Sequence, residues 1–176
     1  YIAGDWTGDD DAIGKIYEWK KDKKLVLDFA DVHSFMQSND DSLPCSIKSS
    51  LRQRLNISKC FVLIVGNETN TITKVSCRYC RYYDSSQWRE MLGLSHCEKN
   101  NHADYRSFVK YECEMARKDY DNGELKKIIV LYNSTRVNKN LCPEILRDVG
   151  VHEAMVYACD GKEYWDYQLV KKLLSE

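Results

Sequence analysis

The chain has 176 residues, 43% of them hydrophobic, which is enough for one domain with a core of its own. Its net charge is −1 and its lysines and arginines are scattered, so no global field favours nucleic acid as a partner. No apolar run in the sequence has the length of a membrane span. We therefore expect a single cytosolic domain over residues 1–176.

Short aliphatic runs alternate with amphipathic helical patterns along the chain. Continuous apolar runs such as CFVLIVG (60–66) and KKIIVLY (126–132) are typical of strands buried on both faces of a parallel sheet. The predicted strands lie at residues 1–4, 25–29, 60–66, 126–132 and 154–158. The predicted helices lie around residues 13–19 and at 47–58, 105–120 and 164–175.

Five strands interleaved with helices indicate parallel strands joined by right-handed crossovers. We therefore expect an α/β fold, a flavodoxin-like three-layer sandwich with a five-stranded parallel sheet. Residues 67–104 interrupt the alternation of strand and helix patterns, because they contain cysteines, histidines and tyrosines but few aliphatic residues. This predicts a Cys-rich insertion after the third strand, within the domain. Ligands of such folds bind beyond the carboxyl ends of the strands. Those ends are expected at residues 5–6, 31–33, 66–69 and 133–135.

Two glutamates in the stretch FVKYECEMA (108–116) have different surroundings if the stretch is helical. Residues three and four positions apart are neighbours on a helix surface. The neighbours of Glu114 are Lys110, Tyr111, Arg117 and Lys118, typical of a solvated face with local charge partners. The neighbours of Glu112 are Phe108, Val109, Met115 and Ala116. Because burying an unpaired carboxylate costs several kcal/mol, Glu112 has a buried partner or lines a cleft.

Known nucleotide-binding and phospho-acceptor patterns do not account for this chain. It contains neither G-x-G-x-x-G nor G-x-x-x-x-G-K-[ST], so the two common Gly-rich phosphate cradles are excluded. The third predicted strand ends in IVGNET, without the aspartate that a response-regulator receiver domain needs. The function must therefore be carried by other residues.

Five segments follow one another along the chain: GDWTGDDDAI, LDFADVHS, SIKSSLRQRLNISKCFVLIVGNET, FVKYECEMA and KKIIVLY. In this order they resemble a TIR-like family that includes the TIR proteins of the bacterial Thoeris anti-phage system. The most specific pieces are the third strand from Ser58 to Thr69 and the V-[KR]-Y-E pattern that opens a helix. The resemblance covers nearly the whole chain.

The resemblance implies an enzyme that cleaves the nicotinamide–ribose bond of NAD, an NAD nucleosidase and ADP-ribosyl cyclase. NAD would be the substrate, with no other cofactor, and a cyclic ADP-ribose-type product would activate a partner effector after a phage-derived trigger. The family's essential glutamate aligns with Glu112. A further copy of the chain is another partner compatible with the family.

A lone carboxylate suits this chemistry. Cleavage of an N-glycosidic bond builds an oxocarbenium-like ribose, which a nearby carboxylate stabilises. Nicotinamide is already cationic in NAD and leaves without a general acid. Candidate substrate-binding residues at the expected rim are Asp5, Trp6, Phe29, Asp31 and His33. Core packing of Phe29, a solvated loop around His33 and a turn contact of Asp5 remain alternatives.

The insertion contains a C-x-x-C pair followed by further cysteine and histidine. Cys77, Cys80, Cys97 and His102 could supply the four closed ligands of a structural zinc site. Free thiols and a disulfide are the alternatives. Two other functions also stay open for the chain: a non-catalytic TIR-like interaction module, and a nucleoside deoxyribosyltransferase-like enzyme that leaves NAD intact.

Overall fold

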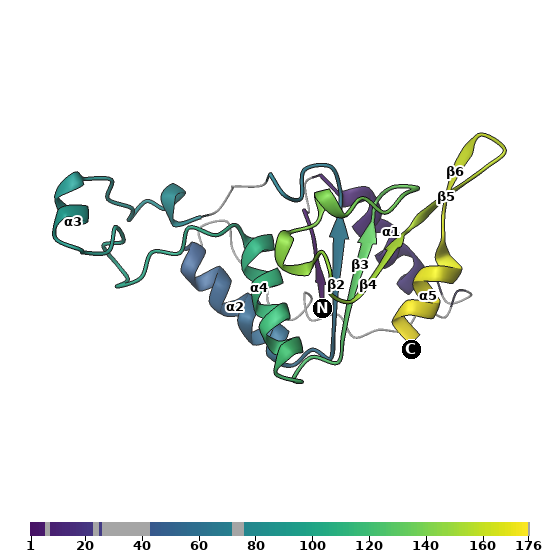
Figure 1. Ribbon diagram of the computed structural model, residues 1–176, viewed down its shortest axis with the longest axis horizontal. Coiled ribbons are helices and arrows are strands. Elements are labelled where there is room, and N and C mark those ends of the chain that lie inside the picture. The colour runs from purple at the N-terminus through teal and green to yellow at the C-terminus, as the bar shows by residue number, and fades with distance from the viewer. Residues whose placement is uncertain (6–7, 23–24, 26–42, 72–75, 176) are drawn as a thin grey trace.

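A four-stranded parallel sheet forms the centre of the computed structural model, which describes residues 1–5, 8–22, 25, 43–71 and 76–175 (Figure 1). The strands, in spatial order, are β1 (Ile2–Ala3), β2 (Cys60–Val65), β3 (Lys127–Tyr132) and β4 (Val151–Ala154). The register places Ile2 beside Val62, Val62 beside Ile129, and Ile129 beside Val151. All neighbouring strands in this sheet are parallel, as predicted.

Helices cover both faces of this sheet. They are α1 (Asp10–Lys21), α2 (Pro44–Asn56), α4 (Phe108–Asp121) and α5 (Tyr167–Ser175). Successive side chains of a strand point to opposite faces. In β2, Phe61 and Leu63 accordingly pack in the core with α2 and α4, whereas Val62 and Ile64 pack in the core with α1 and α5. The continuous apolar pattern of β2 and β3 thus reflects burial on both faces.

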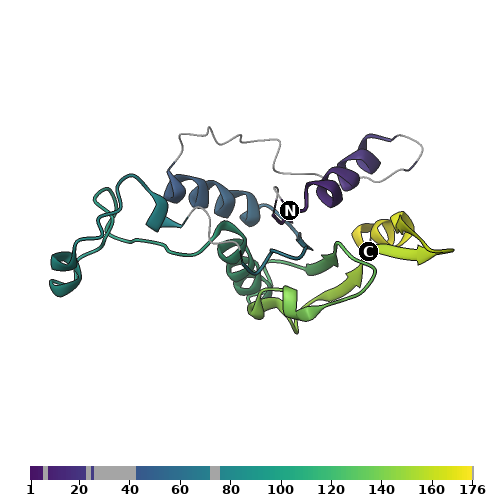
Figure 2. The ribbon, with the colours of Figure 1, turned by 90° about the horizontal axis from the view of Figure 1, so that it is seen from above.

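Where the structure describes it, the insertion carries the short elements η2 (Cys77–Tyr79) and α3 (Gln87–Met91). It extends away from the sheet, with α3 at its far end in both views (Figures 1 and 2). Its apolar side chains are correspondingly exposed, including Trp88 and Met91. Two further short turns, η3 (Lys139–Leu141) and η4 (Glu144–Leu146), occupy the connection between β3 and β4.

The predicted last strand at 154–158 is wrong in its bounds. The parallel strand β4 ends at Ala154, and the chain leaves the sheet at the fully buried Met155. The next residues form an antiparallel hairpin of β5 (Val156–Cys159) and β6 (Lys162–Trp165). Its two-residue turn is Asp160-Gly161, and both residues have positive φ. This is the dipeptide that a tight hairpin turn favours, so the sequence contained the signal.

The closing helix also begins later than predicted. Trp165 belongs to β6, and α5 starts at Tyr167. Asp166 accounts for the start, because its carboxylate accepts a hydrogen bond from the amide of Leu169 at 2.9 Å, as a helix N-cap does. The predicted strand at 25–29 lies outside the described residues except for Leu25, so this strand of the predicted five stays a prediction. No helix in the described ranges is long and apolar enough to cross a membrane.

Candidate functional site

The carboxyl ends of the first three sheet strands meet at a small cavity of about 310 Å³. Asp5 follows β1, Gly66 follows β2 and Asn133 follows β3, and all three line this cavity. The cavity is lined by Asp5, Gly8, Asp9, Gly66, Asn67, Glu68 and Asn133. The sequence-derived expectation that these loops converge at one rim therefore agrees with the structure.

Asp9 is the buried carboxylate of this rim, with 3% of its surface exposed. The side-chain amide of Asn133 donates to it over 3.2 Å. Burial raises the pKa of Asp9, an effect that the hydrogen bond from Asn133 only partly offsets. A Cβ at Gly66 would lie 1.9 Å from Asp9 Oδ1, so only glycine fits against this carboxylate. Asp9 and Gly66 are therefore in direct contact, and a larger residue at position 66 would displace the carboxylate.

Glu112 lies closer to the start of its helix than the sequence suggested. We expected the helix from residue 105, but α4 begins at Phe108. Ser107 is the N-cap, and its hydroxyl accepts a hydrogen bond from the amide of Lys110 at 3.2 Å. Glu112 is therefore the fifth residue of α4, about one turn from the end that faces the carboxyl rim of the sheet.

The Glu112 carboxylate is buried, with 6% exposed, and has a specific partner. The hydroxyl of Tyr1, beside β1, donates a hydrogen bond to Glu112 Oε1. Burial raises the pKa of Glu112 to about 7, while the Tyr1 hydrogen bond and the charge of Arg54 pull the pKa downward. Of the two alternatives, the structure shows the buried partner. Glu112 is not among the residues that line the rim cavity.

Glu114 is partly exposed and has a charge partner, as expected, but the partner lies outside its own helix. Its carboxylate pairs with the guanidinium of Arg106 at 2.6 Å, and 31% of its side chain is exposed. The Arg106 guanidinium also donates two hydrogen bonds to the carboxylate of Asp104, and the Lys48 ammonium lies 3.1 Å from that carboxylate. Burial opposes ionisation of Asp104, but hydrogen bonds from Arg106 and Lys48 outweigh it and lower its pKa to about 2. Glu114 thus belongs to a network that ties α2 to the residues preceding α4.

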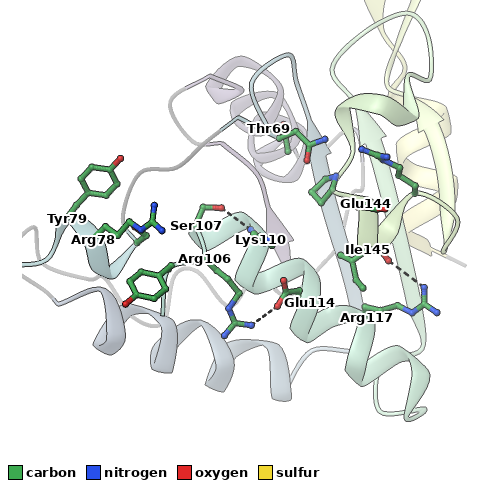
Figure 3. Close-up of a pocket in the computed structure, with 15 residues that line it drawn as sticks. Thr69, Arg78, Tyr79, Arg106, Ser107, Lys110, Glu114, Arg117, Glu144 and Ile145 are labelled. Atoms are coloured by element: carbon green, nitrogen blue, oxygen red, sulfur yellow. Dashed lines mark hydrogen bonds and ion pairs between the residues drawn. The ribbon is translucent and has the colours of Figure 1, made fainter. Parts of the chain in front are cut away.

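A large cavity of about 1100 Å³ lies beside the start of α4 (Figure 3). The segment after β2, the base of the insertion, α4 and the η4 segment all contribute to its walls. Five cationic side chains line it: Arg78, Arg106, Lys110, Arg117 and Arg147. Two carboxylates line it, Glu114 and Glu144. The sequence did not reveal this cavity, because its walls come from four separate segments.

Of the predicted substrate-binding residues, the structure places Asp5 at the small rim cavity. Trp6, Phe29, Asp31 and His33 lie outside the described residues.

The predicted zinc ligands do not form a metal-binding group in this structure. Within the described ranges, no three or more His, Cys, Asp or Glu side chains are placed to hold a metal ion. Cys77, Cys80 and Cys97 are free thiols. The Cys77 sulfur accepts a hydrogen bond from the amide of Asp104 at 3.2 Å, which fastens the base of the insertion to the residues before α4.

Residues 1–77 match the family described as Thoeris protein ThsB, TIR-like domain. The match covers less than half of the chain. The resemblance noted in the sequence is thereby confirmed for residues 1–77.

The ThsB-like part spans β1, α1, α2 and β2, and it ends at the base of the insertion. It contains Tyr1, Asp5 and Asp9 but not Glu112, so the assignment of Glu112 depends on the V-K-Y-E pattern and the geometry of α4. No curated protein and no solved structure matches the chain.

Proposed function

We propose that this chain is a TIR-type enzyme that cleaves the nicotinamide–ribose bond of NAD and forms a cyclic ADP-ribose-type signal. In this proposal a phage-derived trigger starts the reaction, and the diffusible product activates an effector protein. The match of residues 1–77 to the ThsB TIR-like domain is the observation that carries the proposal.

Glu112 is the proposed catalytic carboxylate. Its side chain is buried close to the helix start, and burial raises its pKa to about 7. In such surroundings a carboxylate interacts strongly with positive charge that develops nearby. It would face the oxocarbenium-like ribose and hold the ribose hydroxyls, while the cationic nicotinamide leaves as a neutral molecule. The charged form of Glu112 is the active form in this scheme.

Access to Glu112 requires a change of conformation in our proposal. The carboxylate is 6% exposed and is covered by the hydroxyl of Tyr1. Opening of the contact between Tyr1 and α4 would free the carboxylate for ribose. An enzyme with a covered carboxylate stays inactive until a trigger or self-assembly favours the open form, which agrees with a defence system that must not consume NAD in uninfected cells.

The test compares two isosteric variants of neighbouring glutamates. The wild-type protein, Glu112→Gln and Glu114→Gln are incubated with NAD at high protein concentration, and also expressed in cells whose lysates are taken after phage infection. Nicotinamide release and nucleotide products are followed by mass spectrometry. We expect nicotinamide and a species with the mass of cyclic ADP-ribose from the wild type, and loss of both in Glu112→Gln.

Glu114→Gln is the matched control, because it makes the same change two residues away in the Arg106 network. It should retain most of the activity. Loss of activity in Glu114→Gln alone would move the catalytic role to the large cavity. Intact NAD in all conditions, with all three proteins folded, would favour the interaction module. Consumption of a nucleoside in place of NAD would favour the deoxyribosyltransferase-like enzyme.

A further inference from the structure

The large basic cavity and Glu112 lie on different faces of α4. Successive helix residues are rotated by about 100°, so Lys110 and Glu112 are separated by about 200° around the helix axis. Lys110, Glu114 and Arg117 line the cavity, whereas Glu112 points to Tyr1 in the core. A ligand in this cavity is therefore distinct from a ribose held at Glu112.

The charge of the cavity favours an anion. Arg106 is neutralised by Asp104 and Glu114, and Arg117 by Asp121. Lys110 and Arg78 are exposed, and neither forms an ion pair within the described part of the chain. Arg147 donates its Nε–H to the carbonyl of Cys142, which leaves its charge without a carboxylate partner there. Among the described residues that line the cavity, Glu144 is the one carboxylate outside these pairs, so positive charge predominates.

The wall that carries Arg78 is held in place before any ligand arrives. The amide of Cys77 donates to the carbonyl of Asp104 at 3.0 Å, and the Asp104 amide donates to the Cys77 sulfur. The ammonium group of Lys48, only 4% exposed as a residue, donates to the carbonyls of Asp104 and Arg106 at 3.1 and 2.6 Å. These bonds position the cations on both sides of the cavity, which lowers the entropic cost of binding.

The same wall carries two aromatic rings. Tyr79 is 69% exposed and Tyr105 is 42% exposed, and both line the cavity. The guanidinium of Arg78 lies 5.2 Å from the centre of the Tyr105 ring. Exposed tyrosines and an arginine plane are surfaces on which a nucleobase stacks. The start of α4, with the positive end of its helix dipole, lies at the same cavity.

We propose that this cavity is a second binding site, for a nucleoside diphosphate or triphosphate. Lys110 and Arg78 contact the phosphates, and the base stacks on Tyr79 or Tyr105. The cavity of about 1100 Å³ is large enough for one nucleotide. The site requires no chemistry at Glu112 and therefore binds its ligand whether or not the chain cleaves NAD.

The experiment is a calorimetric titration of the whole protein with ADP, adenosine and pyrophosphate at low and moderate salt. We expect ADP to bind, pyrophosphate to bind more weakly, and adenosine to bind weakest. Lys110→Glu and Arg78→Glu should each weaken ADP binding by roughly tenfold or more, because each removes a charge-assisted contact and adds repulsion. Binding should weaken as salt increases.

The variants are chosen to remain folded. Lys110 is the third residue of α4, where a glutamate next to the Ser107 cap completes a capping box, so Lys110→Glu should not unfold the helix. Lys118→Glu is the matched control, because Lys118 is an exposed lysine on the same helix outside the cavity. It should bind ADP within about twofold of the wild type.

Four outcomes would overturn the proposal. One is the absence of ADP binding at millimolar concentration, and another is unchanged binding in both Lys110→Glu and Arg78→Glu. The third is a single-stranded oligonucleotide that binds far more tightly than ADP, which would make the surface a polymer site. Glu112→Gln should bind ADP like the wild type; loss of binding in that variant would place the nucleotide at Glu112 instead.

Discussion

The hydroxyl of Tyr1, beside β1, donates a hydrogen bond to the carboxylate of Glu112 in α4, 111 residues further along the chain. The contact joins the first strand of the sheet to the helix that carries the candidate catalytic group. It also connects the ThsB-like part of the chain with the part beyond the family match. Changes at these two residues therefore have effects that can be measured on folding as well as on activity.

Glu112 should make the protein less stable as the pH rises. Its pKa is about 7 in the folded state against 4.5 for an unperturbed glutamate, so the folded state holds the proton more strongly. The stability from the protonated carboxyl is complete below about pH 4.5 and is lost as the pH rises through 7. The loss amounts to roughly 3 kcal/mol. Urea unfolding of the wild type and Glu112→Gln at pH 5 and 8 measures it.

In that experiment Glu112→Gln should gain stability relative to the wild type at pH 8 and lose that advantage at pH 5. Glu114→Gln is the control, because the Glu114 carboxylate is paired and partly exposed. Its free energy of unfolding should fall between pH 5 and pH 8 as that of the wild type does. A wild-type and a Glu112→Gln profile that run parallel across this range would contradict the assigned pKa.

Tyr1→Phe should destabilise the protein mainly at high pH. The variant removes the donor to Glu112 and leaves a buried carboxylate without that hydrogen bond, at a cost of about 1–3 kcal/mol. At pH 5, where the carboxyl is protonated, the cost should be smaller. Tyr120→Phe makes the same change at an exposed position of α4 and should be neutral. Equal stability of Tyr1→Phe and the wild type at pH 8 would show that the contact contributes nothing.

Gly66→Ala should destabilise the rim. The added Cβ would lie 1.9 Å from Asp9 Oδ1, so the buried carboxylate or the loop must move, at a cost of about 1–3 kcal/mol. Gly14→Ala in α1 is the control. Nothing lies within 4 Å of its Cβ, and alanine should stabilise the helix by about 0.5–1 kcal/mol. The free energy of unfolding, measured by heat or urea, should fall in Gly66→Ala and rise in Gly14→Ala. A rise in both variants would refute the close approach of Gly66 and Asp9.

Asp104 should contribute stability that disappears in acid. Its pKa is about 2 in the folded state, below its ordinary 3.8, because hydrogen bonds from Arg106 and Lys48 outweigh burial. The contribution is therefore present above pH 3.8 and is lost as the pH falls through 2, and it amounts to roughly 2 kcal/mol. The free energy of unfolding of Asp104→Asn, followed from pH 6 to 2, should converge with that of the wild type. Asp148→Asn, at a carboxylate that is 93% exposed, should show no such convergence.

Much of the fold followed from local patterns. The apolar runs that became β2 and β3 must be buried on both faces, and the helical stripes of α1, α2 and α4 recur at the spacing that one buried face requires. The last strand and helix differ from their predicted bounds because of a turn and a helix cap. At such positions a single residue sets where an element begins or ends. Asp160-Gly161 turns the chain into a hairpin, and Asp166 delays the start of α5 until Tyr167.

The sequence by itself determined the parallel α/β core and the similarity of residues 1–77 to the ThsB TIR-like domain. It also showed that the residues three and four positions from Glu112 in its helix are apolar. These depend on periodicity and residue order, which are local properties. The tertiary structure decided which group covers Glu112, why Glu114 is paired with Arg106, and where a basic cavity forms. The reason is that each involves segments distant in sequence, and their contacts depend on how the insertion and the η4 segment pack around α4.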